Sequence, residues 1–326
     1  MDGDNWNNNT NWCTDAPLNE WYGVQVEGGE VVSINLNYNN LSGDVPPEIT
    51  QLTHLRDFVV YGNNITSLPE NFGELKSLEY LDCDGTNLGV FPPQVLELTN
   101  LRELWLNGNG IEGQLPEGLA NLTSLEYLYL YDNEFSGVLP DFLAQLTNLR
   151  VLELDVNQFE GFIPIAYFNN LSNLETFNVR WNNLTGTITK ELQQSPMWQN
   201  LKYKYVREQN DGYGIDIEGA VTEIQVNSTD VTLLVGQEFQ FFVTGVYPQD
   251  ADNTSTYWEM DDRYQQYVSF DPATGKVKAL KDGTAWINVR ASDKNGAFTE
   301  CRVRVISSIS QGNTESYTVV EDDWDK

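Results

Sequence analysis

The sequence predicts a mostly β protein, with an α/β-type solenoid built around a parallel sheet and then an all-β sandwich. The first observation is a unit of about 24 residues, with the pattern LxxLxLxxNxL, that recurs through the first two thirds of the chain. The second is a change, near residue 220, to short β-type segments separated by turn residues. With 326 residues and 40% hydrophobic composition, the chain is long enough for two units with real cores.

The repeats are recognised by one polar position that recurs every 23 to 25 residues. Seven copies fill this position with Asn39, Asn63, Thr86, Asn109, Asn133, Asn157 and Asn182. One turn cannot bury its apolar side alone, so the turns must stack and their LxL segments become short parallel strands. The asparagine amide can then satisfy backbone groups in the buried turn, and we expect Thr86 to satisfy fewer of them.

On these residues, the chain from about residue 31 to 200 resembles the leucine-rich repeat family. Five turns also share a glycine two positions after the last apolar residue, as in IEGQLP at 111–116. This resembles the plant-type subclass, whose convex side is extended or 3-10 in conformation and not fully helical. The second and third turns read ITSLP and LGVFP, which is more like a short bacterial variant.

Residues 1–30 resemble the N-terminal cap of plant-type repeats, with Cys13 followed by Trp21 and Gly23. Such caps commonly close with a cysteine pair, but no second cysteine follows here, so we expect no cap disulfide and a cap that depends on burying Trp12 and Trp21. The solenoid with its C-terminal cap is expected at residues 31–219, where LKYKYV (201–206) adds one last strand.

Residues 220–306 resemble the bacterial immunoglobulin-like domain of group 2. The cues are Gly236, Trp258, Gly275, Gly283 and Cys301 within seven short β-type segments. The resemblance implies that Trp258 lies in the core, that Cys301 points inward without a cysteine partner, and that the domain acts as a spacer or adhesion module. We expect residues 307–326 to form an acidic tail.

The composition excludes several function classes. With 48 acidic and 18 basic residues, the net charge of −30 argues against nucleic acid or an anionic membrane as partner. The lone histidine, His54, and three cysteines support neither a zinc site nor a catalytic triad, so we expect no cofactor, no metal and no enzyme activity. A glycosidase pair or weak calcium site at Asp82, Asp84 and Glu103 was the alternative, but an open sheet offers no deep pocket to raise a carboxyl pKa.

The residues between the inward leucines should point to the concave surface, about 4.8 Å from their equivalents in the next turn. Read this way, the concave face gathers aromatic and acidic side chains, and Trp105 stands in the middle of them. The candidate partner-binding residues are Asp57, Tyr61, Tyr80, Asp82, Asp84, Glu103, Trp105, Tyr127, Tyr129, Tyr131, Asp132, Glu153, Asp155 and Trp181. Six of the aromatic rings cluster centrally: Tyr61, Tyr80, Trp105, Tyr127, Tyr129 and Tyr131. A monomer rarely leaves such a patch open without use.

Two hypotheses of different class follow. In the first, the concave face of a monomer binds a protein or peptide with basic residues, through tyrosine and tryptophan contacts typical of interfaces. In the second, the aromatic rings stack on the sugar rings of a glycan. A third interpretation makes the chain a structural spacer. The resemblance favours an extracellular or bacterial cell-surface location, although the first residues, MDGDNWNNN, show no signal-peptide pattern.

Overall fold

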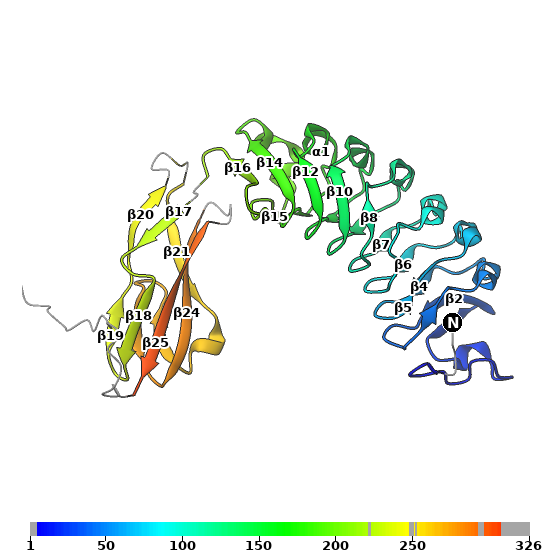
Figure 1. Cartoon of the computed structure of the whole chain (residues 1–326), viewed down its shortest axis with the longest axis horizontal. Helices are drawn as coiled ribbons and strands as arrows, with labels where there is room; N and C mark the ends of the chain where they lie inside the picture. Colours follow the sequence, from blue (N-terminus) through cyan, green and yellow to red (C-terminus); the bar gives the residue numbers. More distant parts are fainter. Residues whose placement is uncertain (1–4, 221–222, 248–250, 252, 293–296, 308–326) are drawn as a thin grey trace, which may run out of the picture. The chain divides into compact units, whose positions relative to one another are not determined.

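The computed structural model describes residues 5–220, 223–247, 251, 253–292 and 297–307. It divides the chain into two compact units, Met1–Asp216 and Ile217–Lys326. The first unit is a solenoid whose turns stack one on the next, from blue to green in Figure 1. The predicted mostly β fold class, a repeat solenoid followed by a sandwich, is confirmed.

The concave side of the solenoid is a nine-stranded sheet. Its strands, in order, are β1 (Val24–Glu27), β2 (Glu30–Asn35), β4 (Asp57–Val59), β6 (Tyr80–Asp82), β7 (Glu103–Trp105), β9 (Tyr127–Tyr129), β11 (Val151–Glu153), β13 (Thr176–Asn178) and β15 (Tyr203–Tyr205). The first two strands form an antiparallel pair, and the others pair in parallel with matching positions side by side. The expected last strand in LKYKYV is therefore confirmed as β15.

The convex side is mostly extended or 3-10, as predicted. Its strands are β3 (Ser42–Gly43), β5 (Asn64–Ile65), β8 (Glu112–Gly113), β10 (Glu134–Val138), β12 (Gln158–Gly161), β14 (Asn183–Ile188) and β16 (Gly214–Ile217). Its helical turns are η3 (Pro47–Gln51), η4 (Glu70–Glu74), η5 (Pro93–Glu97), η6 (Glu117–Asn121), η7 (Asp141–Gln145), α1 (Ile165–Asn170), η8 (Leu192–Gln194) and α2 (Pro196–Asn200). The five shared glycines all have φ between +80° and +113°, which explains the residue type.

The repeated asparagine bonds to buried backbone groups of its own turn and of the preceding turn. Asn133 Nδ2 donates to the carbonyls of Leu106 and Leu130 at 2.9 and 3.1 Å, while its Oδ1 accepts from the amides of Asn109 and Ile111. The single hydroxyl proton of Thr86 is shared between two acceptors, the Cys83 carbonyl at 3.0 Å and Oδ1 of Asn109 at 2.5 Å. No described backbone amide donates to Thr86, so the expectation that it satisfies fewer groups is confirmed.

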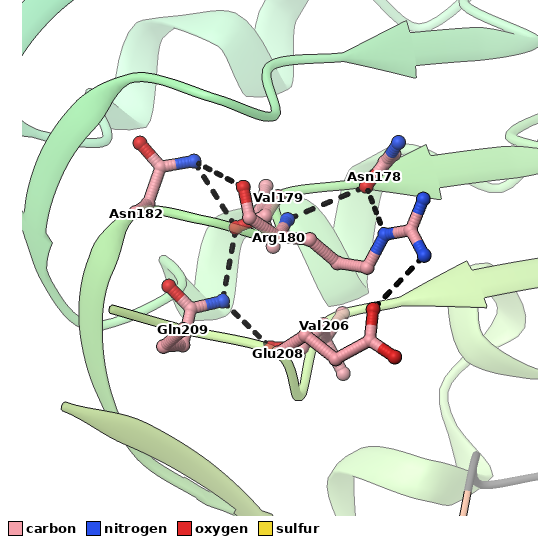
Figure 2. Close-up of polar contacts among 7 residues, drawn as sticks. All are labelled: Asn178, Val179, Arg180, Asn182, Val206, Glu208 and Gln209. Atoms are coloured by element: carbon pink, nitrogen blue, oxygen red, sulfur yellow. Dashed lines mark hydrogen bonds and ion pairs between the residues drawn. The ribbon is translucent and has the colours of Figure 1, made fainter. Parts of the chain in front are cut away.

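An eighth copy of the unit, missed in the sequence, closes the solenoid. Gln209 takes the asparagine position and donates from Nε2 to the carbonyls of Val179 and Val206, at 2.9 and 2.8 Å (Figure 2). Its Oε1 accepts from the Leu184 amide at 3.2 Å. The glutamine side chain therefore makes the bonds of the repeat with one more methylene.

The N-terminal cap includes η2 (Leu18–Glu20) and a row of three tryptophans. The rings of Trp6 and Trp12 lie 5.0 Å apart, and those of Trp12 and Trp21 lie 5.1 Å apart. The expectation of buried rings needs correction: Trp12 and Trp21 are half-buried, because they pack largely on each other. Cys13 is exposed and not in a disulfide.

The second unit is a sandwich of short strands, shown from yellow-green to red in Figure 1. The strands are β17 (Glu223–Val226), β18 (Asp230–Leu234), β19 (Glu238–Gln240), β20 (Val243–Tyr247), β21 (Thr256–Met260), β22 (Val268–Asp271), β23 (Lys276–Ala279), β24 (Gly283–Ala291) and β25 (Phe298–Ile306), with η9 (Asp262–Tyr264) between β21 and β22. They form sheets β18-β25-β24-β21, β19-β23-β22 and β17-β20. Trp258 packs, half-buried, against two apolar clusters, and Cys301 is fully buried and unpaired. The predicted acidic tail lies outside the described residues except for Ser307.

Candidate binding face

The open side of the concave sheet is built from fixed positions in each turn. In β7, β9 and β11 the middle residue is buried and its two neighbours are half-buried, because alternate side chains of a strand point to opposite faces. The register places Trp105 between Asp82 and Tyr129 of the adjacent strands. Of the fourteen predicted residues, all but Trp181 come from β4, β6, β7, β9, β11 or the turns that follow them, and Trp181 follows β13.

The aromatic side chains pack on one another. The rings of Trp105 and Tyr129 are stacked, with centroids 3.8 Å apart and planes inclined by 24°. Tyr61 meets the ring of Tyr38 edge-on at 4.8 Å, and the guanidinium of Arg150 lies 5.9 Å from the ring of Tyr127. The prediction of six openly exposed rings is therefore corrected, since all six are half-buried.

Asp82 is the most deeply buried of the predicted acids. Only 5% of its surface is exposed. Its carboxylate accepts a hydrogen bond from the Asp84 amide at 3.0 Å and another from the Tyr80 hydroxyl at 3.2 Å. Burial raises the pKa of Asp82 to about 6, and the nearby Asp84 charge adds to this. The expectation that an open sheet cannot raise a carboxyl pKa is therefore wrong at Asp82, and direct contact between Asp82 and a partner is limited by its burial.

Glu153 and Asp155 share a second acidic environment. Burial raises the pKa of both carboxyl groups, and the charge of Asp155 raises that of Glu153 further, while Arg180 acts in the opposite direction. The Oδ1 atom of Asp155 is buried and has no hydrogen-bond partner. Within the described ranges, none of the seven predicted concave carboxylates forms an ion pair.

One position of each turn, directly before the repeated asparagine, has a left-handed backbone. It is occupied by Tyr38, Gly62, Gly85, Gly108, Asp132, Val156 and Trp181, with φ between +48° and +67°. Glycine adopts this conformation without strain, whereas a bulky or β-branched side chain does not. The second, third and fourth turns use glycine, and the other turns display exposed side chains there, including Asp132 and Trp181.

The C-terminal end of the face contains residues that sequence reasoning missed. The guanidinium of Arg180 lies between the rings of Trp181 and Tyr205, 4.7 and 4.6 Å from their centroids. It also forms an ion pair with Glu208 at 2.9 Å, and Asn178 accepts from its Nε (Figure 2). The signal that could have found this group was the eighth copy of the repeat, hidden by glutamine at the asparagine position.

A row of alternating charges, which was not among the residues predicted from the sequence, follows one edge of the concave sheet. The residue after the first leucine of each copy alternates in sign, and we call this set the edge row: Arg56, Glu79, Arg102, Glu126, Arg150, Glu175 and Lys202. Arg102 pairs with Glu126, and Arg150 with Glu175 at 2.6 Å. Most of the row lines a groove of about 1150 Å³. Two acids of the row, Glu126 and Glu175, are therefore neutralised by basic side chains of the same row, whereas the described acids of the concave face form no ion pair.

Neither a metal-binding cluster nor a membrane-spanning helix is present in the described residues. No three His, Cys, Asp or Glu side chains in this part of the chain are placed to hold a metal ion. In the same residues, no helix combines the length and the apolar character needed to cross a membrane.

The stacked turns, the asparagine ladder and the sandwich define a solenoid repeat protein with an immunoglobulin-like domain. The chain belongs to the leucine-rich repeat family: the model of a leucine-rich repeat region matches residues 33–209. The model of the bacterial Ig-like domain (group 2) matches residues 220–301.

Individual relatives share only parts of their length with this chain. Receptor-like kinase TMK4 of Arabidopsis thaliana is 32% identical over 82 residues, which are 25% of this chain and 8% of the kinase. The leucine-rich repeat ectodomain of the Arabidopsis thaliana receptor kinase GASSHO1/SCHENGEN3, solved with CASPARIAN STRIP INTEGRITY FACTOR 2, is 27% identical, with a TM-score of 0.50 over 61% of this chain and 24% of that one. A plant ice-binding protein shares the fold, with 22% identity and a TM-score of 0.54 over 69% of this chain and 75% of that one.

Proposed function

We propose that this chain is a non-catalytic, extracellular binding protein that recognises a protein or peptide through its concave face. The observation that carries the proposal is the contrast between the two acidic regions of the solenoid. Glu126 and Glu175 of the edge row form ion pairs with basic residues of the same row, whereas the described carboxylates around Trp105 and Tyr129 form none. Unpaired, partly desolvated carboxylates beside aromatic rings suit a partner that brings positive charge.

The comparisons support the same function class. The GASSHO1/SCHENGEN3 ectodomain was solved with a bound partner, and its repeats are similar to those of this chain. The family of the second unit fits a spacer or adhesion module at a bacterial cell surface, which we include in the proposal. The glycan alternative is less well supported, because the Trp105 and Tyr129 rings cover one face of each other.

The proposal is tested by panning a displayed library of random 12-residue peptides against the full chain. The matched control is the Trp105→Ala, Tyr129→Ala double variant, whose folding is checked by its thermal unfolding midpoint. We expect peptides that bind the chain, fail to bind the variant, and weaken with added salt because exposed charges are screened. A glycan array probed with the same two proteins tests the alternative. Glycans that bind the full chain but not the double variant would support the glycan alternative in place of the proposal.

A further inference from the structure

In the second to fourth turns, one position of the concave face carries no side chains and exposes the backbone. Gly62, Gly85 and Gly108 occupy the left-handed position in three successive turns, with φ of +67°, +54° and +61°. The ring of Tyr38 covers Gly62, but a Cβ placed on Gly85 would meet no side chain within 4 Å. Open space therefore lies above Gly85. In the turns without glycine, the side chain at the same position fills the equivalent space.

Two carboxylates border this exposed backbone. A Cβ placed on Gly108 would stand 3.7 Å from Oδ2 of Asp132 and 3.8 Å from Oδ1 of Asp84. The two side chains come from turns on opposite sides of Gly108, so their oxygens approach the same point from two directions. In the part of the chain that the structure describes, neither of them has an ion-pair partner, and their mutual repulsion adds to the burial that raises the pKa of Asp84.

A buried amide at the same place has hydrogen-bonding capacity left over. Asn107, directly before Gly108, is fully buried, and its Oδ1 accepts from the Tyr131 amide at 3.1 Å. Its Nδ2 is close enough to Asp84 to lower the pKa of that carboxyl, but makes no bond with hydrogen-bond geometry. Buried polar groups are nearly always hydrogen-bonded, so an unused donor beside two carboxylates that have no ion pair indicates a site that a ligand completes.

We propose that the space above Gly85 and Gly108, which we call the glycine seat, receives one lysine or arginine side chain of the bound protein or peptide. The ammonium or guanidinium group bridges Asp84 and Asp132 through charge-assisted hydrogen bonds. The glycines are required because a side chain at these positions would occupy the seat.

This inference rests on the proposed function. It adds the requirement that the partner supplies a lysine or arginine, and this requirement can be tested separately. Two displayed peptide libraries are panned against the full chain, one with all residue types and one that encodes neither lysine nor arginine. The binders are then measured against Asp84→Asn and Asp132→Asn, which keep side-chain size. The control is Glu160→Gln, an exposed acid in β12 on the convex side.

We expect binders from the complete library to share one basic residue and to lose about tenfold to a hundredfold in affinity on Asp84→Asn and on Asp132→Asn, with no loss on Glu160→Gln. The library without lysine and arginine should return no peptide that depends on Trp105 and Tyr129. A ring-dependent peptide without lysine or arginine would contradict the proposed glycine seat. Binders whose affinity is unchanged by both aspartate substitutions would also contradict it, and in either case the proposed function would remain supported. If neither library gives a binder that depends on the two rings, both proposals fall together.

Discussion

At the scale of single residues, Asp82 shows what the repeat does to a side chain placed between two leucines. The position faces outward by strand alternation, but neighbouring turns cover it to 5% exposure. Its carboxyl group therefore loses water and its pKa rises to about 6. The chain therefore keeps a carboxylate there at a cost in stability at neutral pH.

We predict that Asp82→Asn stabilises the protein at neutral pH. A carboxyl whose pKa is raised by folding binds its proton more tightly in the folded state, so stability decreases as the pH rises from the unfolded value near 4 to the folded value of about 6. The variant should unfold with a free energy about 1–2 kcal/mol higher at pH 7.5, and with no gain at pH 3. Denaturant titrations at both pH values measure this.

The control for Asp82→Asn is Asp44→Asn, for which we expect a change in stability of the opposite sign. Two hydroxyls, those of Ser67 and Thr66, lower the pKa of Asp44. Asp44→Asn should therefore lose stability at neutral pH and not gain it. A loss on Asp82→Asn at pH 7.5 would show that the charged form is favoured in the folded state.

Sequence reasoning located residues more reliably than it described their surroundings. The repeat pattern placed all fourteen concave residues, because strand alternation and stacking depend on spacing alone. Exposure and pKa depend on which side chains meet across turns, as Trp105 meets Tyr129, and spacing does not contain that information. Arg180 and Tyr205 were missed for another reason. Gln209 makes the hydrogen bonds of the repeated asparagine, and the LxxLxLxxNxL pattern does not allow glutamine at that position.

At the scale of the elements, the asparagine ladder fixes each turn to the next. Asn157 accepts from the Phe135 amide at 3.0 Å and donates to the carbonyls of Leu130 and Leu154 at 3.0 and 3.1 Å. Because these backbone groups are buried, they cannot form hydrogen bonds with water when the asparagine side chain is removed.

We predict that Asn157→Ala lowers the free energy of unfolding by about 2–4 kcal/mol, since several buried groups lose their partners at once. The control is Asn148→Ala, which removes one exposed bond to the Thr123 carbonyl and should cost less than about 1 kcal/mol. Chemical denaturation of both variants checks the difference, and equal losses would contradict the ladder's role.

The reverse change should improve the ladder at its weak position. Thr86→Asn supplies an oxygen long enough to accept from backbone amides of the previous turn, as Asn63 and Asn109 do in theirs. We expect a gain of about 0.5–1.5 kcal/mol in the free energy of unfolding. No gain would mean that Thr86, through its bonds to Cys83 and Asn109, already serves the turn fully.

At the scale of the whole molecule, each region carries one thiol. Cys13 in the cap is exposed, whereas Cys83 in the solenoid and Cys301 in the immunoglobulin-like unit are buried. Burial raises the pKa of both buried thiols, that of Cys301 to about 11, so their reactive thiolate forms are suppressed.

We predict that one thiol per native chain reacts rapidly with Ellman's reagent. The other two should react only as urea unfolds the unit that holds each of them. Single Cys→Ala variants assign the signals, so Cys83 reports unfolding of the solenoid and Cys301 unfolding of the sandwich. Rapid reaction of two or three thiols without denaturant would contradict the burial of these side chains.

The edge row also bears on how such a solenoid can lengthen or shorten. Its charges alternate from Arg56 to Lys202, one per turn. Losing a single turn, such as the one with Glu126, would set Arg102 beside Arg150, where like charges repel. Losing two adjacent turns would restore the alternation. The smallest duplication or deletion that preserves the alternating charges is therefore a pair of repeats, about 48 residues of chain.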